Sequence, residues 1–358
     1  MEKAGYLVLQ NGRVFKGRSV GAHKNAVSRL LFFTGMTGFG EVLTDPGYKG
    51  MMVVPSFPMF GARMMDEYGH PPQKPLLSAL IVRDLQNESL LPDGPETLGR
   101  YLAEHGIPCL TDVDTRAVVK AIRTSGEMNA ALVHDEPNVT ETIRLLSEHI
   151  VWPEPECGDA VQADEQADGP RVVILDCGTR AELMRDLKRC GCKVTVMPAD
   201  ASAKDALAVH PDGVILSGGP GLPASCTSYI KTAYDIASSG VPMMGVGLGH
   251  LLLALAMGAQ VNEMRCGHHG AALPVQDLRG NVFLTLQNHF HAVDDLTLPP
   301  HARVIHKNLN DGTCEGLEYL HIPAFSVQFY PETPRSYPCV SNVLWHFTDL
   351  IRGYRPCR

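Results

Sequence analysis

Long apolar runs and an excess of positive charge are both missing from this 358-residue sequence. Apolar residues never continue for the ~20 positions of a membrane-spanning helix, and MEKAGYLVLQNG at the start lacks the apolar core of a secretory signal peptide. Lys and Arg number 31 against 39 Asp and Glu, a net charge of −8, whereas nucleic-acid binding calls for a basic stripe. We therefore expect a cytoplasmic protein with no membrane and no nucleic-acid partner.

Cysteine spacings typical of a disulfide framework or a zinc site are also missing. The ten cysteines are scattered along the chain, and the one close pair, Cys190 and Cys192, has no second pair at zinc-site spacing. We expect reduced thiols, no metal and no cofactor.

The composition changes at one place, VWPEPECGDAVQADEQADGP, residues 151–170. This stretch is acidic, contains three prolines and shows no apolar periodicity beyond its first residues, as is typical of an exposed linker. We predict two domains, residues 1–150 and 171–358, joined by this linker.

Residues 1–150 carry both strand and helix patterns. Apolar runs flank an Asn-Gly pair in residues 5–17, which predicts a hairpin. An apolar stripe in residues 112–126 predicts a helix, with Asp114 placed to cap its start and Gly126 placed to end it. This half is predicted to be a mixed α/β domain.

Residues 171–358 alternate apolar runs with helical stretches. RVVILD at 171–176 is typical of a strand covered on both faces, and the strand–helix alternation after it predicts a doubly wound, mostly parallel sheet. Ligands of such sheets bind beyond the carboxyl ends of the strands, where SGGPG (217–221) and GVGLGH (245–250) fall. A last amphipathic helix at 339–353 should pack on the core.

Each glycine-rich turn is a weak signal by itself. SGGPG is equally typical of a loop that needs positive φ and of backbone N–H groups that face an oxyanion. GVGLGH has the strand–turn–helix form in which several hydrolase families display a nucleophile, but its apex, Gly247, has no side chain.

Together with the rest of the chain, these turns resemble the small subunit of carbamoyl-phosphate synthetase, a class I glutamine amidotransferase. The sequence contains, in that family's order, LVLQNGRVFKGRSVGA, FTGMTGFGEVLTDPGYKG, DVDTRAVVKAIRTSGEMN, ILSGGPG, GLGHLLLALAMGA, GHHGAALPV, LQNHFHAVD, NDGT and FSVQFYPE. The resemblance implies a small-subunit N-terminal domain in residues 1–150 and an amidotransferase-like domain in residues 171–358. Members of the family hydrolyse glutamine and pass the ammonia through a tunnel to an ATP-grasp large subunit.

The resemblance also implies a catalytic triad that is not intact here. The family writes its cysteine in G-x-C-x-G-H-Q and its histidine and acid in H-P-E. In this chain those three positions are Gly247, Tyr330 and Glu332. Glycine offers no nucleophile, and tyrosine, with a reference pKa near 10, is a poor proton shuttle at neutral pH.

The glutamine pocket that the family implies departs as well. Its substrate-binding serine is Gly47, a glutamine is Leu251, and a glycine and a phenylalanine are Phe290 and His291. What remains is a frame of family positions: Gly219, Gly221, Leu248, Gly249, His250 and Asn288. We expect a smaller, more apolar pocket that neither binds nor hydrolyses glutamine.

Other cysteines and histidines offer alternative chemistries. Cys226, Cys266 and Cys314 lie near motifs but not at the elbow, and a thiol without a positioned base is more often structural. A metal site could draw on Cys266 and the histidines, but four of the five histidines match family positions that hold no metal. These are His250, His268, His269, His289 and His291. Structural histidines are therefore expected.

Three functional hypotheses follow. The leading one is a small subunit with an inactive glutaminase, which acts as a structural or activating partner of a carbamoyl-phosphate synthetase large subunit that uses ammonia, in pyrimidine or arginine biosynthesis. The alternative is a regulatory or ligand-binding pseudo-amidotransferase that has left the synthetase. A third, an active amidotransferase with an unusual mechanism, needs a nucleophile that the motifs do not provide.

Overall fold

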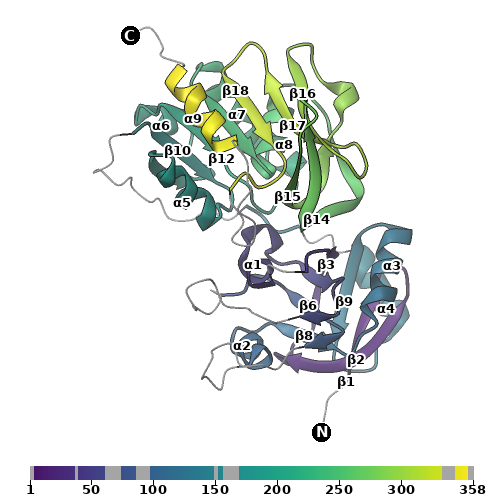
Figure 1. Cartoon of the computed structure of the whole chain (residues 1–358). Coiled ribbons are helices and arrows are strands. Elements are labelled where there is room, and N and C mark those ends of the chain that lie inside the picture. Colours follow the sequence, from purple (N-terminus) through teal and green to yellow (C-terminus); the bar gives the residue numbers. More distant parts are fainter. Residues whose placement is uncertain are drawn as a thin grey trace. The chain divides into compact units, whose positions relative to one another are not determined.

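The computed structural model describes residues 4–36, 39–60, 74–85, 97–148, 152–155, 169–332 and 343–353 (Figure 1). The chain divides into two compact units, Met1–Pro153 with Arg265–Ala271, and Glu154–Met264 with Ala272–Arg358. Most of the expected linker lies outside the described residues. The short segment Arg265–Ala271 joins the first unit although it comes from the second half of the chain, which no local sequence pattern indicated.

The first unit is a closed barrel with the strand order β1-β2-β8-β6-β4-β3-β9. Its strands are β1 (Ala4–Leu9), β2 (Val14–Gly21), β3 (Ala26–Phe33), β4 (Met52–Pro55), β6 (Ala79–Ile81), β8 (Pro108–Thr111) and β9 (Met128–Val133). A separate parallel pair is formed by β5 (Met59–Phe60) and β7 (Asp84–Leu85). Strands β3, β4, β6 and β8 pair in parallel, while β1 and β2 form the predicted antiparallel hairpin.

Helices complete the first unit, as the mixed α/β prediction required. They are α1 (Phe39–Thr44), the 3₁₀ turn η1 (Pro46–Tyr48), α2 (Leu98–Glu104), α3 (Thr115–Ser125) and α4 (Val139–Glu148). The Asp114 carboxylate accepts a hydrogen bond from the Ala117 N–H and caps α3, which ends at Gly126 with φ +90°. Both cap predictions are confirmed. The apolar face of α3, with Val118 and Ile122 fully buried, packs against the barrel core.

The second unit is a nine-stranded sheet in the order β11-β10-β12-β13-β18-β17-β16-β14-β15. Its strands are β10 (Arg171–Asp176), β11 (Lys193–Pro198), β12 (Gly213–Leu216), β13 (Met243–Val246), β14 (Val261–Asp277), β15 (Val282–Val293), β16 (Ala302–Asn308), β17 (Cys314–Tyr319) and β18 (Ala324–Val327). The first five strands in this order are parallel, as the alternation predicted. Antiparallel pairing begins at β17, which extends the sheet beyond its parallel part.

Helices pack along this sheet and bury its apolar residues. They are α5 (Ala181–Arg189), α6 (Ala203–Ala208), α7 (Thr227–Ser238), α8 (Leu248–Ala256) and α9 (Val343–Gly353), with 3₁₀ turns η2 (Pro223–Ser225) and η3 (Asp295–Thr297). The predicted last helix is confirmed for the part that is described, and Phe347 in α9 is fully buried. No helix in the described ranges combines the length and the apolar character needed to cross a membrane.

Four loops follow the carboxyl ends of neighbouring parallel strands. They comprise residues 177–180 after β10, 217–221 after β12, Gly247 after β13, and 328–332 after β18. Because parallel strands end at the same edge of a sheet, these loops lie together. Two of these loops carry the replaced triad positions, Gly247 and Tyr330.

Candidate functional site

Gly247 forms the sharp turn between β13 and α8. Its φ and ψ are +53° and −112°, a combination that residues with a side chain rarely adopt. Its N–H donates a hydrogen bond of 2.9 Å to the Val327 carbonyl, and its own carbonyl accepts from the His250 N–H at 3.1 Å. The turn therefore has the strained form that displays a nucleophile, while the residue at its apex has nothing to display.

Close approach of α8 to the sheet holds this turn in place. A Cβ on Gly249 would lie 2.2 Å from the Leu216 carbonyl oxygen, so only glycine fits. The Gly249 N–H donates a hydrogen bond of 3.1 Å to the Ser217 carbonyl. The retained glycine of the GVGLGH motif thus serves the packing of helix on strand.

Tyr330 lies next to Gly218, which is also a neighbour of Gly247. A Cβ built on Gly247 would lie 3.3 Å from the Gly218 Cα, and one built on Gly218 would lie 3.5 Å from Tyr330 Cε1. The tyrosine is only 6% exposed. Both replaced triad positions therefore have Gly218 as a neighbour, and the Tyr330 ring is buried.

Glu332, the acid that remains, is paired with a cation. Arg180 Nη1 lies 3.2 Å from Glu332 Oε1, and the two side chains are 6% and 2% exposed. The Arg180 guanidinium also lies 4.6 Å from the centroid of the Tyr330 ring and 3.8 Å from the Glu182 carboxylate. A carboxylate held in this way neutralises an arginine, whereas in a triad it would orient a histidine.

Arg180 was not among the residues that the sequence analysis singled out. One signal was present, because Arg180 follows β10 by four residues, at the sheet edge where ligands bind. Its partner could not have been identified, since Glu332 lies 152 positions further along the chain and follows a different strand.

The apolar pocket positions divide between two clusters. Leu251 is 3% exposed and belongs to the main core of the second unit, so its side chain replaces a polar substrate contact with core packing. Leu248 belongs to a smaller cluster with Cys177, Cys226 and Leu252. A Cβ on Gly221 would lie 3.2 Å from Pro155 and 3.5 Å from Leu248, so these two side chains pack next to this glycine.

Strand β15 carries three of the predicted pocket residues. Phe290 and His291 are each 7% exposed, and Asn288 is half-buried. The carbonyl of His291 accepts a 2.9 Å hydrogen bond from His289 Nδ1. Both replacements are therefore buried parts of the strand. Gly219 follows β12 in the SGGPG loop and is half-buried.

Gly47, at the family's serine position, lies in η1 of the first unit. It is buried, and its N–H donates a 2.8 Å hydrogen bond to the Asp45 carboxylate. With no side chain, it has no hydroxyl to offer a substrate.

The histidines considered as metal ligands have protein partners. His250 Nδ1 and the Ser326 hydroxyl share a 2.8 Å hydrogen bond, and burial lowers the His250 pKa to about 3. His289 Nε2 lies 3.3 Å from Gln287 Oε1. In the first unit, His269 Nε2 lies 3.2 Å from Glu127 Oε1. These contacts place His250, His269 and His289 in buried polar networks, and the absence of a bound metal stays a prediction.

The thiols considered as substitute nucleophiles lie in unfavourable surroundings. Burial raises the pKa of Cys226 to about 11 and that of Cys314 to about 12, and it also raises the pKa of Cys266. The nucleophilic form of cysteine is the thiolate, and burial disfavours that form at all three positions. These surroundings do not favour any of the three as a substitute nucleophile.

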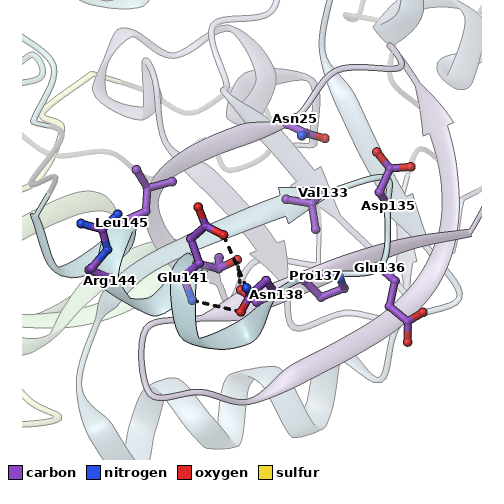
Figure 2. A pocket seen from close by; sticks show the side chains of 10 residues that line it. Asn25, Val133, Asp135, Glu136, Pro137, Asn138, Glu141, Arg144 and Leu145 are labelled. Atoms are coloured by element: carbon purple, nitrogen blue, oxygen red, sulfur yellow. Dashed lines mark hydrogen bonds between the residues drawn. The ribbon is translucent and has the colours of Figure 1, made fainter.

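A cavity of about 320 Å³ lies in the first unit, between the end of β9 and the start of α4 (Figure 2). Three of its lining residues are acidic: Asp135, Glu136 and Glu141. The Asn138 side chain caps α4 by accepting from the Glu141 N–H at 3.3 Å, and its amide lies 3.5 Å from the Glu141 carboxylate. These polar groups serve the start of the helix, and we assign the cavity no ligand.

Two family models match this chain, one in each half of the sequence. The family model "Glutamine amidotransferase class-I" matches residues 173–337, and "Carbamoyl-phosphate synthase small chain, CPSase domain" matches residues 7–132. Among solved structures, a glutamine amidotransferase from Thermotoga maritima superposes with a TM-score of 0.36 and 18% identity over 46% of this chain and 76% of its own. That likeness is too slight to carry an argument.

Curated relatives match along nearly the whole chain. The carbamoyl phosphate synthase small chain of Escherichia coli K12 is 35% identical over 378 residues, which cover 99% of both chains. Those of Pectobacterium atrosepticum and Vibrio cholerae are 36% and 35% identical, and the matches cover 99% of this chain and 99% and 100% of theirs. The chain therefore belongs to the family of carbamoyl phosphate synthase small chains.

Proposed function

We propose that this protein is a carbamoyl phosphate synthase small chain without glutaminase activity, and that it acts as a structural or activating partner of an ATP-grasp large chain. The large chain then takes ammonia from solution. The observation that carries the proposal is Gly247, a residue without a nucleophile at the apex of a nucleophile's turn.

Three further features of the same sheet edge support the loss of glutaminase activity. Tyr330 replaces the proton shuttle and is packed beside Gly218. The remaining acid, Glu332, is paired with Arg180. Leu251 lies in the apolar core, where it offers no hydrogen bond to an amide substrate. Acyl transfer from glutamine needs a nucleophile, a base and an oriented acid, and no group at these positions supplies the first two.

Partnership with a large chain is supported by the extent of the family match. The small-chain-specific domain matches over residues 7–132, and that unit keeps a closed barrel with well-formed helix caps. No cofactor is required for a partner role, and a cytoplasmic location stays part of the proposal.

The test is an assay of the purified chain with the large chain of the same organism, supplied with glutamine or with ammonium. We expect carbamoyl phosphate from ammonium, and from glutamine only the amount that contaminating ammonium explains. The control adds an active small chain, such as that of Escherichia coli, to the same large chain. Equal efficiency with glutamine and ammonium would overturn the proposal, and so would failure of the two chains to associate.

A further inference from the structure

Helix α3 exposes a row of positive charges on a protein of net charge −8. Arg116, Lys120 and Arg123 are spaced four and three residues apart, all are exposed, and the helix contains no acidic residue. The opposite side of α3 is buried in the barrel core. We call Arg116, Lys120 and Arg123 the basic face.

The basic face has no acidic partner within the part of the chain that the structure describes. Among the residues with a described placement, no ion pair involves any of its three members. Other helices of the protein place an acid three or four residues from a basic residue: Arg100–Glu104 in α2, Arg144–Glu148 in α4, Lys231–Asp235 in α7 and Arg352–Asp349 in α9. Helix α3 therefore lacks the spacing of basic and acidic residues that these four helices share.

This arrangement destabilises the helix. Like charges three or four residues apart repel each other by roughly 0.2–0.5 kcal/mol per pair, and the basic face contains two such pairs. Arg116 also lies in the first turn, where the positive end of the helix dipole disfavours a cation. Arg123 lies in the last turn, where the helix dipole favours a cation. An acid or an uncharged side chain at Arg116 or Lys120 would relieve the repulsion, so the stability of the helix does not explain the whole row.

A neighbouring ring holds one of the three charges in place, and a further arginine extends the surface. The Arg123 guanidinium lies 5.3 Å from the centroid of the Phe32 ring. Beyond the end of the helix, exposed Arg265 donates a hydrogen bond to the Thr124 carbonyl. Positions that are fixed before binding reduce the entropy lost when a partner arrives.

We propose that the basic face is a docking surface for an acidic protein surface and, resting on the proposed function, that this surface belongs to the large chain. The three charges span about 10 Å along a convex helix, which suits a protein surface better than a small anion that needs an enclosing pocket. Nucleic acid is disfavoured because the remainder of this acidic chain repels it. Charge complementarity of this kind accelerates association and makes it sensitive to salt.

The experiment measures binding of the full-length protein to the large chain, at low and at high salt. The test variant carries Arg116→Gln, Lys120→Gln and Arg123→Gln together. The matched control carries Lys188→Gln, Lys204→Gln and Arg279→Gln, which are exposed residues of the second unit, and removes the same charge. A third variant, Arg116→Lys with Arg123→Lys, keeps the charge.

We expect the test variant to associate about tenfold more slowly at low salt, with a smaller salt dependence, while its melting temperature is unchanged or higher. The matched control and the lysine variant should associate like the wild type. Equal effects of the test and control triples, or no effect of either, would overturn the docking surface. The docking surface would also be overturned if the test variant bound the large chain like the wild type and lost only binding to an RNA oligonucleotide. If the wild-type protein does not bind the large chain, the proposed function itself fails, and the two failures are thereby told apart.

Discussion

Arg180 and Glu332 form a buried ion pair, with 3.2 Å between Nη1 and Oε1, across the carboxyl ends of β10 and β18. Glu332, at the family's acid position, is thus paired with an arginine. Its charge is matched within the protein, and the Tyr330 ring lies against the same guanidinium. The departure from the family's triad thus extends past the cysteine position to the acid, which here contacts an arginine.

This ion pair predicts strong energetic coupling between the two side chains. Arg180→Met alone leaves the buried Glu332 carboxylate without this cation, and Glu332→Gln alone leaves the buried Arg180 guanidinium without this carboxylate. Either single variant should lower the free energy of unfolding by about 3–5 kcal/mol. The double variant should lose clearly less than the sum of the two. Urea unfolding of the four proteins, followed by fluorescence and by far-UV circular dichroism, measures the cycle.

An exposed pair serves as the control for that cycle. Lys231 and Asp235 lie in α7 with side chains that are 76% and 42% exposed, and their coupling should be below about 1 kcal/mol. Additive effects at Arg180 and Glu332, similar to those at the exposed pair, would show that the buried contact does not hold this edge of the sheet together.

The backbone at Gly247 predicts that even alanine is costly there. Gly247→Ala would force φ +53° and ψ −112° on a residue with a Cβ and place that atom 3.3 Å from the Gly218 Cα. We expect the free energy of unfolding to fall by about 1–3 kcal/mol. Gly258→Ala is the comparison, because Gly258 has φ +94° but open space around its Cβ position, and it should cost less. Equal losses would mean that the contact with Gly218 is relieved easily.

Local patterns in the sequence predicted much of the fold. The Asn-Gly hairpin, the capped helix α3 and the parallel core strands from β10 to β13 all depend on short-range chemistry: turn residues, caps and apolar runs. These signals lie within a few residues of the element they specify, so the structure confirms them.

Long-range pairings were beyond the reach of those patterns. The strand order that closes the barrel, the antiparallel extension from β17 to β14, and the placing of Arg265–Ala271 in the first unit depend on contacts between distant segments. At the site, the motifs identified Gly247 and Tyr330 as altered positions. The pairing of Arg180 with Glu332 needed the sheet to bring two loops together.

Restoring the two lost catalytic side chains is predicted to recover little activity. In Gly247→Cys with Tyr330→His, the new cysteine Cβ lies close to Gly218, Leu251 stays in the core, and Arg180 still engages Glu332. We expect glutamine hydrolysis to stay on the order of 10²-fold or more below that of an active small chain, because the base is not oriented by its acid.

The ammonium released from glutamine, with and without the large chain, gives the measurement. Tyr330→His alone is the negative control, since it adds a base without a nucleophile. Hydrolysis by the double variant at rates close to those of the Escherichia coli small chain would show that the pocket still accepts glutamine.

Burial of His250 predicts that stability falls on acidification. The imidazole has a pKa of about 3 in the folded protein against 6.5 in its ordinary state, so the unfolded chain takes up a proton that the folded chain excludes. The contribution is complete above about pH 6.5 and is lost as pH falls toward 3. His306, whose pKa is lowered to about 4 by burial, acts in the same direction.

The variant His250→Asn should flatten this dependence. Between about pH 6.5 and about pH 5, the free energy of unfolding should fall by about 2 kcal/mol less in His250→Asn than in the wild type. Urea unfolding at each pH gives the measurement. His210→Asn, at an exposed position, should leave the slope unchanged. A slope that is the same in wild type and His250→Asn would place the acid sensitivity elsewhere.

The burial of Cys226 and Cys314 predicts that neither thiol acts as a hidden nucleophile. Because burial raises the pKa of Cys226 to about 11 and that of Cys314 to about 12, iodoacetamide at neutral pH should leave both unmodified in the native protein and modify both in urea. An electrophilic glutamine analogue should label neither residue, and peptide mapping by mass spectrometry assigns any label to its position. Stoichiometric, glutamine-protectable labelling of a single cysteine would identify a nucleophile and restore the case for an active amidotransferase with an unusual mechanism.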